Sequence, residues 1–290
     1  MIGERLTDLL LQRGYHVSHL GRKVSNGKVI TYLWDIERNY IDPEALRNVD
    51  AIVHLAGVNI GEKRWTRKRK KEILDSRIDT ARLLYNELKK QTHSVECIIC
   101  AAGSSYYGLD NGGKLAEEDD KPGDDFLATV CQLWEQELDK FQELGIRLVK
   151  LRAAIVLSPK GGALKKMKRP TELYVGAVLA SGSQLMTWIH IDDHCGIIIR
   201  SLEDGLMVGA YNSVAPNPVT NEQFTKEMAS VLHRPILLPH APAFVLRIVF
   251  GEMAALVLYG IRLSPEKIIR AGYTFKFTTI RKALEDLLKE

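Results

Sequence analysis

The chain has 290 residues, a hydrophobic content of 46% and a net charge of +4, which suit a globular protein with one sizeable core. Its longest apolar runs, 51–58 and 97–102, have the length of strands, whereas a membrane-spanning helix needs ~20 apolar residues. We therefore expect no span of a bilayer and no membrane partner. Four scattered cysteines and the lack of a secretory signal pattern predict a cytoplasmic protein.

The predicted elements of the first half alternate between amphipathic helices and apolar strands. In chain order they are helix 2–12, strands 15–20, 29–34 and 51–56, helix 66–90, strand 96–102, helix 126–144 and strand 146–151. Gly14 and Gly145 close two of the helices. Strands separated by helices need right-handed crossovers. The fold class is therefore α/β, a Rossmann-like doubly wound parallel sheet covered on both faces.

The second half departs from this alternation. A turn at Gly161 and Gly162 precedes a basic segment, the motif WIHIDD occupies 188–193, and a helical, loop-rich tail begins at 217. We expect two domains. The Rossmann-like domain comprises 1–158 and 187–215, and a smaller α+β substrate domain comprises 159–186 and 216–290.

The glycine-rich turn that opens a dinucleotide-binding sheet is mostly missing. Such a sheet begins with a buried strand and a GxxGxxG loop, and here only Gly3 stands at the place of the last glycine. In the usual order 3-2-1-4-5-6 the missing strand would lie between strands 15–20 and 51–56, so its loss exposes two interior edges. Two interpretations stay open: a sequence record that begins late, which we favour, and a genuine short form with a rewired sheet.

Two conspicuous patterns have ordinary structural interpretations. Cys97 and Cys100 form a CxxC in a strand, where residues three apart point to opposite faces, so we expect buried thiols and no metal site. The basic run RWTRKRKK at 64–71 opens the helix 66–90, whose apolar stripe predicts one buried face. The basic residues are interpreted as its solvated face, and no nucleic-acid partner is expected because no recognition motif accompanies them.

Several segments together resemble the extended short-chain dehydrogenase/reductase superfamily. They are GERLTDLLLQRGYHVSHLGR, DAIVHLAG, KRWTRKRKKEILDSRIDTARLL, SYYG, WIHIDD and YNSVAPNPVTNEQF. The tail motifs RPILLPHAPAFVLR, GEMAALVLYGIRLSP and AGYTFKF narrow the resemblance to its epimerase-like subfamily with a C-terminal domain of its own. Members are labelled nucleoside-diphosphate-sugar epimerases or, in some cases, cell-division inhibitors. The resemblance covers nearly every residue from Gly3 onward.

The resemblance implies a nicotinamide dinucleotide cofactor. Strand 15–20 leads into Arg22 and Lys23 with no acidic residue to bind the ribose of NAD. Arg22 is instead placed to pair with a 2′-phosphate, which favours NADP (NADPH), although ordinary loop charges are the alternative. Arg77 is a weaker candidate for a phosphate contact and is otherwise a surface charge. The predicted cofactor-binding residues are Gly3, Arg22, Lys23, Leu55, Ala56, Gly57 and Arg77.

The catalytic residues that the resemblance implies are absent. The superfamily uses a Tyr and, four residues later, a Lys that lowers the Tyr pKa. Leu127 and Cys131 occupy those places, and neither can transfer the proton. Ala102 and Gly103 stand where the superfamily serine is expected. The remaining candidates for catalysis are Ser104, Tyr106 and Tyr107, whose alternative role is packing under a loop.

The substrate side is predicted from the second half. We expect a small-molecule substrate in a pocket lined by 161–167, 174–188 and the tail near Arg262, with Trp188 and Arg262 as contacts. His190, Asp192 and Asp193 invite a metal interpretation, but their spacing favours a strand-to-helix junction with Asp192 or Asp193 as the helix cap. A homodimer through helix 126–144 is a further expectation.

Two functions follow from these residues. The first is an NAD(P)-dependent epimerase or oxidoreductase of the extended short-chain type, with NADP preferred and a small, nucleotide-linked substrate among the candidates. The second is a non-catalytic NADP-binding regulator or sensor, which keeps the fold but lacks the Tyr and Lys pair.

Overall fold

A parallel four-stranded sheet forms the centre of the computed structural model, which describes residues 1–289. Its order is β12-β8-β6-β5, and every neighbouring pair is parallel. The strands are β5 (Ala51–His54), β6 (Cys97–Cys100), β8 (Arg147–Ala153) and β12 (Gly209–Ser213). All four residues of β6 are buried, as expected for an apolar strand covered on both faces. The predicted doubly wound α/β class is confirmed.

A second, smaller sheet is built around β3 (Ile30–Asp35). It pairs in parallel with β1 (His19–Gly21), whereas β2 (Ser25–Asn26) and β4 (Tyr40–Ile41) are antiparallel to it. Within residues 1–289, β1 and β5 do not pair with each other. The parallel strands therefore form two sheets, and the division falls between β1 and β5. The predicted strand order places the missing first strand at this position.

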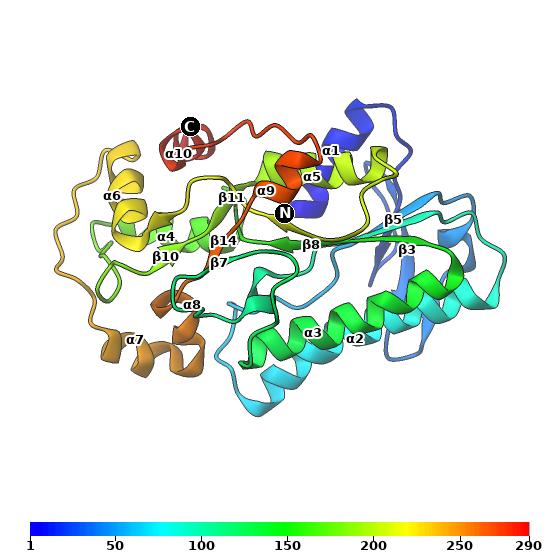
Figure 1. Ribbon diagram of the computed structural model, residues 1–290, viewed down its shortest axis with the longest axis horizontal. Coiled ribbons are helices and arrows are strands. Elements are labelled where there is room, and N and C mark those ends of the chain that lie inside the picture. Colours follow the sequence, from blue (N-terminus) through cyan, green and yellow to red (C-terminus); the bar gives the residue numbers. More distant parts are fainter. Residues whose placement is uncertain (290) are drawn as a thin grey trace.

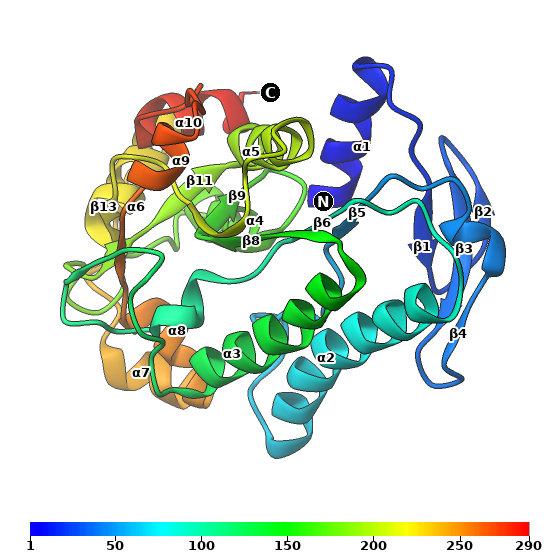
Figure 2. The same ribbon diagram turned by 45° about the vertical axis from the view of Figure 1, so that its right-hand side comes forward.

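Helices cover the central sheet on both faces (Figures 1 and 2). One face carries α2 (Arg67–Lys90) and α3 (Phe126–Asp139), and the other carries α1 (Ile2–Gln12) and α5 (Ile191–Glu203). Thr66 caps α2 by accepting a hydrogen bond from the Arg69 amide. The helix predicted at 126–144 is α-helical only to Asp139 and continues as a 3₁₀ helix, Lys140–Leu144, which ends at left-handed Gly145.

The two faces of the sheet have separate cores. Cys97 and Ile99 pack on the α1 and α5 side, and Ile98 and Cys100 pack on the α2 and α3 side. The prediction that the two thiols of the CxxC point to opposite faces is therefore confirmed. Among the residues described, no helix combines the length and the apolar character needed to cross a bilayer.

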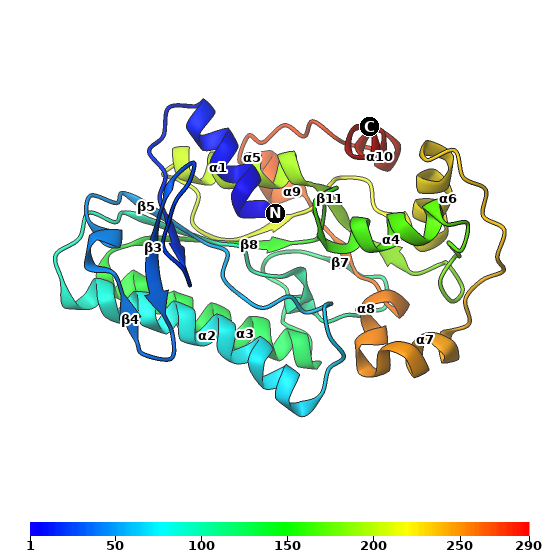
Figure 3. The ribbon, with the colours of Figure 1, turned by 180° about the vertical axis from the view of Figure 1, so that it is seen from behind.

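The second half adds short strand pairs and helices beside the sheet (Figures 1 and 3). The strand pairs are β9 (Ile155–Leu157) with β11 (Trp188–His190), β10 (Leu185–Met186) with β13 (Val219–Thr220), and β7 (Leu115–Ala116) with β14 (Arg262–Leu263). The helices are α4 (Gly162–Glu172), α6 (Asn221–Val231), α7 (Ala243–Phe250), α8 (Ala255–Leu258), α9 (Glu266–Arg270) and α10 (Ile280–Leu288). Further 3₁₀ turns are Pro43–Leu46, Ser104–Tyr107 and Gly251–Ala254.

The motif WIHIDD is a strand-to-helix junction, as predicted, but a different residue caps the helix. His190 is the N-cap of α5, and its Nδ1 accepts a hydrogen bond from the Asp192 amide at 3.0 Å. The prediction that Asp192 or Asp193 is the cap was wrong because both carboxylates have tertiary partners. Asp192 binds the Arg5 guanidinium through both oxygens, at 2.6 and 2.7 Å, and thereby joins α5 to α1.

Asp193 anchors the carboxy-terminal segment to α5. Its fully buried carboxylate accepts hydrogen bonds from the Tyr273 hydroxyl at 2.9 Å and from the amides of Lys276 and Phe277 at 2.8 and 3.0 Å. Gly196 allows this approach, because a β-carbon there would collide with the Tyr273 hydroxyl. The segment leads into α10, whose apolar residues join the core on the α5 side.

Removing the Asp193 carboxylate is expected to release this segment. The change Asp193→Ala leaves a hydroxyl and two amides without their acceptor, so the free energy of unfolding should fall by roughly 3 kcal/mol. The control Tyr273→Phe removes one of the three bonds and should cost about 1 kcal/mol. Urea denaturation measures both, and equal losses for the two variants would contradict this role.

Candidate functional site

The amino-terminal end of α1 lies against the segment that follows the carboxyl end of β5. Gly3, in the first turn of α1, lies against Leu55, and a β-carbon at Gly3 would be 3.6 Å from Leu55 Cδ1. Helix amino-termini carry unpaired amides that favour an anion. The structure thus brings Gly3 next to Leu55, Ala56 and Gly57, which the sequence analysis assigned to one cofactor.

Arg22 and Lys23 follow β1 directly, and both side chains are exposed. The strand ends at Gly21 without an acidic residue, as the sequence indicates. Two cations at the end of β1, which pairs with β3, can pair with a phosphate on the ribose of a dinucleotide. Their exposure leaves them available to a ligand.

Arg77 lies over Gly57. A β-carbon at Gly57 would come within 3.1 Å of Arg77 Cζ, so the absence of a side chain there admits the guanidinium. Nη1 donates to the Ile73 carbonyl at 2.9 Å, and Cζ is 5.3 Å from the centre of the Trp134 ring. Burial lowers the pKa of Arg77. A half-buried cation that no carboxylate of residues 1–289 pairs with is therefore placed beside the predicted cofactor residues.

His54, at the carboxyl end of β5, was not singled out by the sequence analysis. Thr80 Oγ1 donates to the Ser76 carbonyl at 2.8 Å, so at 3.1 Å it can only accept from His54 Nε2. The imidazole is buried, and burial, followed by the charge of Arg77, lowers its pKa to about 4. A histidine within the apolar run AIVHLAG was the available signal for this site.

The places of the missing Tyr and Lys face the protein interior. Leu127 and Cys131 of α3 are both buried, and the Cys131 sulfur would lie 3.4 Å from a β-carbon at Gly103. Burial raises the pKa of the Cys131 thiol to about 12, so it stays protonated at neutral pH. Neither side chain supplies the positive charge that a lysine would bring.

Tyr107 is held in a buried polar network. Its hydroxyl donates to Asn212 Oδ1 at 2.8 Å and accepts from Arg152 Nη1 at 2.9 Å. Arg152 in turn pairs with both carboxylate oxygens of Glu135, each at 2.9 Å. Burial raises the pKa of Tyr107. To donate a proton to a substrate, this phenol would have to leave Asn212, so the geometry favours packing under the loop over general acid catalysis.

Tyr106 and Ser104, the other predicted catalytic residues, are half-buried in the same 3₁₀ turn. The Arg152 guanidinium lies 3.4 Å from the centre of the Tyr106 ring, a cation–π contact. Arg152 was not identified as a site residue from the sequence, although an arginine in the apolar strand RLVKLRA is an available signal. Its guanidinium lies over the rings of both Tyr106 and Tyr107.

The two predicted substrate contacts have very different environments. Trp188 is fully buried, and its indole nitrogen donates to the Asn217 carbonyl at 3.0 Å. Arg262 is exposed on β14, next to β7. The Trp188 indole is therefore occupied within the protein, whereas Arg262 is open to a ligand.

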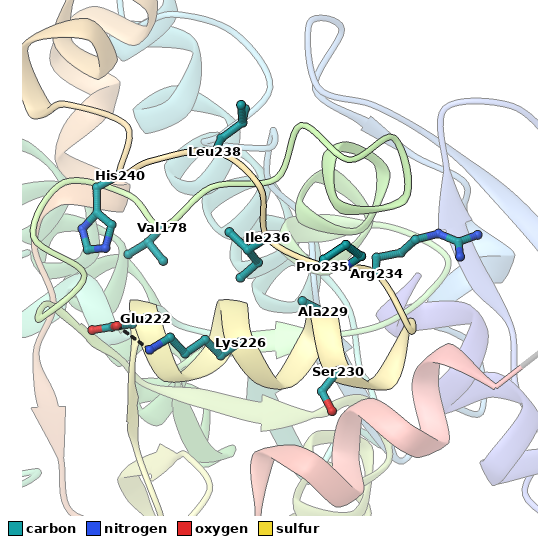
Figure 4. A pocket seen from close by; sticks show the side chains of 10 residues that line it. All are labelled: Val178, Glu222, Lys226, Ala229, Ser230, Arg234, Pro235, Ile236, Leu238 and His240. Atoms are coloured by element: carbon teal, nitrogen blue, oxygen red, sulfur yellow. Dashed lines mark ion pairs between the residues drawn. The ribbon is translucent and has the colours of Figure 1, made fainter.

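A groove of about 510 Å³ lies between α6 and the segment that follows it (Figure 4). Figure 4 shows that apolar side chains and the ionic side chains of Glu222, Lys226 and Arg234 border it. Of the predicted lining segments only Val178 contributes, and none of the predicted cofactor or catalytic residues does. This groove is separate from the edge that carries Gly57 and Arg77.

The fold defines an α/β protein of the extended short-chain dehydrogenase/reductase type. The model of the NAD dependent epimerase/dehydratase family matches residues 1–212, and a domain of unknown function matches residues 241–287. The chain belongs to the NAD dependent epimerase/dehydratase family.

Individual relatives agree with this assignment. The epimerase family protein YfhF of Bacillus subtilis is 34% identical, with 100% of this chain and 95% of the relative covered. The human epimerase family protein SDR39U1, solved with NADPH, is 32% identical with a TM-score of 0.87 over 99% of this chain and 95% of that chain. A UDP-glucose 4-epimerase from Thermotoga maritima, 18% identical, shares the fold with a TM-score of 0.79 over 99% and 94% of the two chains.

Two buried histidines are expected to make the stability depend on pH. Burial lowers the pKa of His54 and His194 from 6.5 to about 4, so the folded protein keeps both neutral where the unfolded chain protonates them. The free energy of unfolding should therefore fall as the pH drops from 6.5 towards 4, by up to about 1.4 kcal/mol per pH unit for each histidine.

Urea denaturation across this pH range measures the slope. The variant His54→Asn should show a shallower slope than the parent protein, because it has one titrating imidazole fewer. The control His16→Gln removes an exposed histidine and should leave the slope unchanged. Identical slopes for the parent and His54→Asn would contradict a neutral, buried His54.

Proposed function

We propose that the protein binds NADP(H) and uses it in an oxidoreductase or epimerase reaction on a small molecule, with a nucleotide-linked sugar as the leading candidate. The observation that carries this proposal is the pair of exposed cations, Arg22 and Lys23, at the end of β1, where no carboxylate competes for a 2′-phosphate. The similarity to a human protein solved with NADPH supports it.

The residues present fit the two ribose groups of this cofactor, and part of a pyrophosphate site is also present. Arg22 and Lys23 would hold the phosphorylated ribose, and the backbone of Leu55–Gly57 would face the nicotinamide ribose, with Arg77 adding positive charge. Gly3 and the first turn of α1 would lie beside the pyrophosphate. The cofactor would supply or accept a hydride, and the protein's own groups would orient the substrate and move the proton.

Arg77 is proposed to supply the positive charge that the superfamily lysine normally provides. Cys131 occupies the place of that lysine on α3, and Arg77 reaches the same neighbourhood from α2, between Gly57 and Trp134. Burial raises the pKa of the Cys131 thiol, and the charge of Arg77 acts in the opposite direction. A cation in this position stabilises negative charge that develops on a substrate oxygen.

The preference for NADPH is expected to depend on Arg22. The change Arg22→Ala removes a charge-assisted contact and should weaken NADPH binding roughly 10- to 100-fold while leaving NADH binding within a few-fold. Isothermal titration with each nucleotide measures this difference. The control Arg13→Ala removes an exposed arginine at the far end of α1 and should change neither affinity. Equal losses for NADPH and NADH would refute a 2′-phosphate contact.

A non-catalytic NADP(H)-binding regulator is the second candidate. The observation in its favour is that the candidate catalytic groups are used within the protein. The Tyr107 hydroxyl both donates and accepts a hydrogen bond, and Leu127 and Cys131 are buried. A protein that only senses the cofactor needs no proton donor. We further expect a cytoplasmic location and a homodimer through α3 for either function.

Tyr107→Phe separates the two roles of this residue. If Tyr107 packs under the loop, the free energy of unfolding falls by about 1 kcal/mol and the turnover of the folded variant stays within a few-fold of the parent. Turnover is followed as deuterium transferred from deuterated NADPH to a panel of carbonyl compounds, and as NADPH formed when NADP⁺ is mixed with a panel of nucleotide sugars. A loss of ~100-fold or more in transfer, with stability retained, would instead identify Tyr107 as the general acid. Tight NADPH binding without transfer to any compound would favour the regulator.

A further inference from the structure

Helix α7 exposes most of its apolar side chains. Its sequence is AFVLRIVF, and Leu246 is its only buried residue. Phe244 and Ile248 are 64% and 69% exposed, and Val245 and Val249 are exposed beside them. We call these four side chains the apolar face of α7. Large exposed apolar surfaces on soluble proteins mark places where another molecule binds.

The basic run at the start of α2 lies next to this helix. Arg64 Nη2 donates to the Ile248 carbonyl at 3.2 Å, and Lys70 forms an ion pair with Glu252, just after α7. In Figures 1 and 3 the amino-terminal end of α2 and the whole of α7 reach the same edge of the molecule. A motif first interpreted as a solvated helix face therefore borders an exposed apolar helix.

Several cations at this edge have no carboxylate partner within residues 1–289. Three other cations of the run form ion pairs with acidic residues: Arg69, Lys70 and Lys71. The nearby carboxylates Glu62 and Glu252 are among their partners. The exposed cations without a carboxylate partner form what we call the basic rim: Lys63, which precedes the run, Arg64, Arg67 and Lys68 of the run, and Arg247 of α7. The rim is a local excess of positive charge around the apolar face.

This combination favours one kind of occupant. A second copy of the chain, docked through the same helix, would bring two basic rims together, and like charges oppose that contact. A partner helix would need a groove to enter, and no α7 residue lines the groove of Figure 4. Apolar side chains that project from an edge and are surrounded by cations are instead the pattern of helices that lie in the interface of an anionic bilayer.

We propose that the apolar face of α7 and the basic rim form one docking surface for an anionic lipid bilayer. The helix lies in the plane of the headgroups, the side chains of Phe244 and Ile248 enter the acyl boundary, and the rim pairs with lipid phosphates. Eight residues are too few to cross the bilayer, so docking is peripheral and reversible. The surface is independent of the cofactor residues and does not rest on the proposed function.

Vesicle flotation tests this surface with the full chain. The probes are vesicles of phosphatidylcholine alone and vesicles that also contain phosphatidylglycerol, each at low and high salt. We expect binding to the anionic vesicles to be at least about tenfold stronger and to weaken as salt screens the rim. Equal binding to both vesicle types, or no binding to either, would overturn the proposal.

Two variants assign the binding to the two parts of the surface. Phe244→Ser with Ile248→Ser, and Arg64→Gln with Arg67→Gln and Lys68→Gln, should each weaken binding to anionic vesicles by about tenfold or more. Matched controls are Leu206→Ser, an exposed leucine after α5, and Lys89→Gln with Lys90→Gln at the other end of α2, and both should bind normally. Circular dichroism and thermal unfolding confirm that the variants fold, which their exposed positions predict.

Other occupants would produce different results. If the parent protein ignores vesicles but forms a dimer in sedimentation experiments, and Phe244→Ser with Ile248→Ser abolishes that dimer, the face is a contact between copies and the lipid proposal is overturned. If the serine variant binds anionic vesicles as well as the parent does, charge alone is responsible and the apolar face has no role. That result also overturns the proposal.

Discussion

The buried ion pair between Arg152 and Glu135 is the interaction on which the shape of the site depends. It joins β8 to α3, and both partners are 4% exposed. A guanidinium buried to this extent must have all its donors satisfied, because an unpaired buried charge is strongly destabilising. Arg152 also donates to the Tyr107 hydroxyl and to the Glu118 carbonyl, at 2.9 and 2.8 Å, so that each of its three nitrogens has a partner. The 3₁₀ turn Ser104–Tyr107 is held in place by this requirement.

The consequence is a site whose two sides differ. On the proposed cofactor side, Arg22 and Lys23 are exposed cations, and the lack of a side chain at Gly57 admits the Arg77 guanidinium. On the catalytic side, the polar groups are used within the protein, and the places of the missing Tyr and Lys are filled by apolar contacts. A reaction at this edge would rely on positioning and on the charge of Arg77 more than on an activated tyrosine.

Helix α2 connects the proposed cofactor site with the proposed lipid surface. Arg67 lies in its first turn and Arg77 ten residues later, which is about 15 Å along a helix axis. Arg67 and Lys68 of the basic rim and the half-buried Arg77 therefore belong to the same helix.

The sequence by itself determined the elements and the family, because periodicity, caps and turn glycines act over a few residues. Helix 2–12, the opposite faces of Cys97 and Cys100 and the cations after β1 could all be predicted in this way. Strand limits were less accurate, since β1 begins only at His19 where its pairing with β3 starts.

Only the tertiary structure decided what the polar residues do. The partner of Tyr107, Asn212, is 105 residues away, and Asp193 binds a segment more than 80 residues later, so no local pattern reveals either contact. For the same reason His190 became the helix cap, Arg77 came to lie over Gly57, and α7 was left without a covering element. Hydrogen bonds and burial depend on distances in space. For residues far apart in the chain, these distances are set by tertiary packing and cannot be predicted from local sequence patterns.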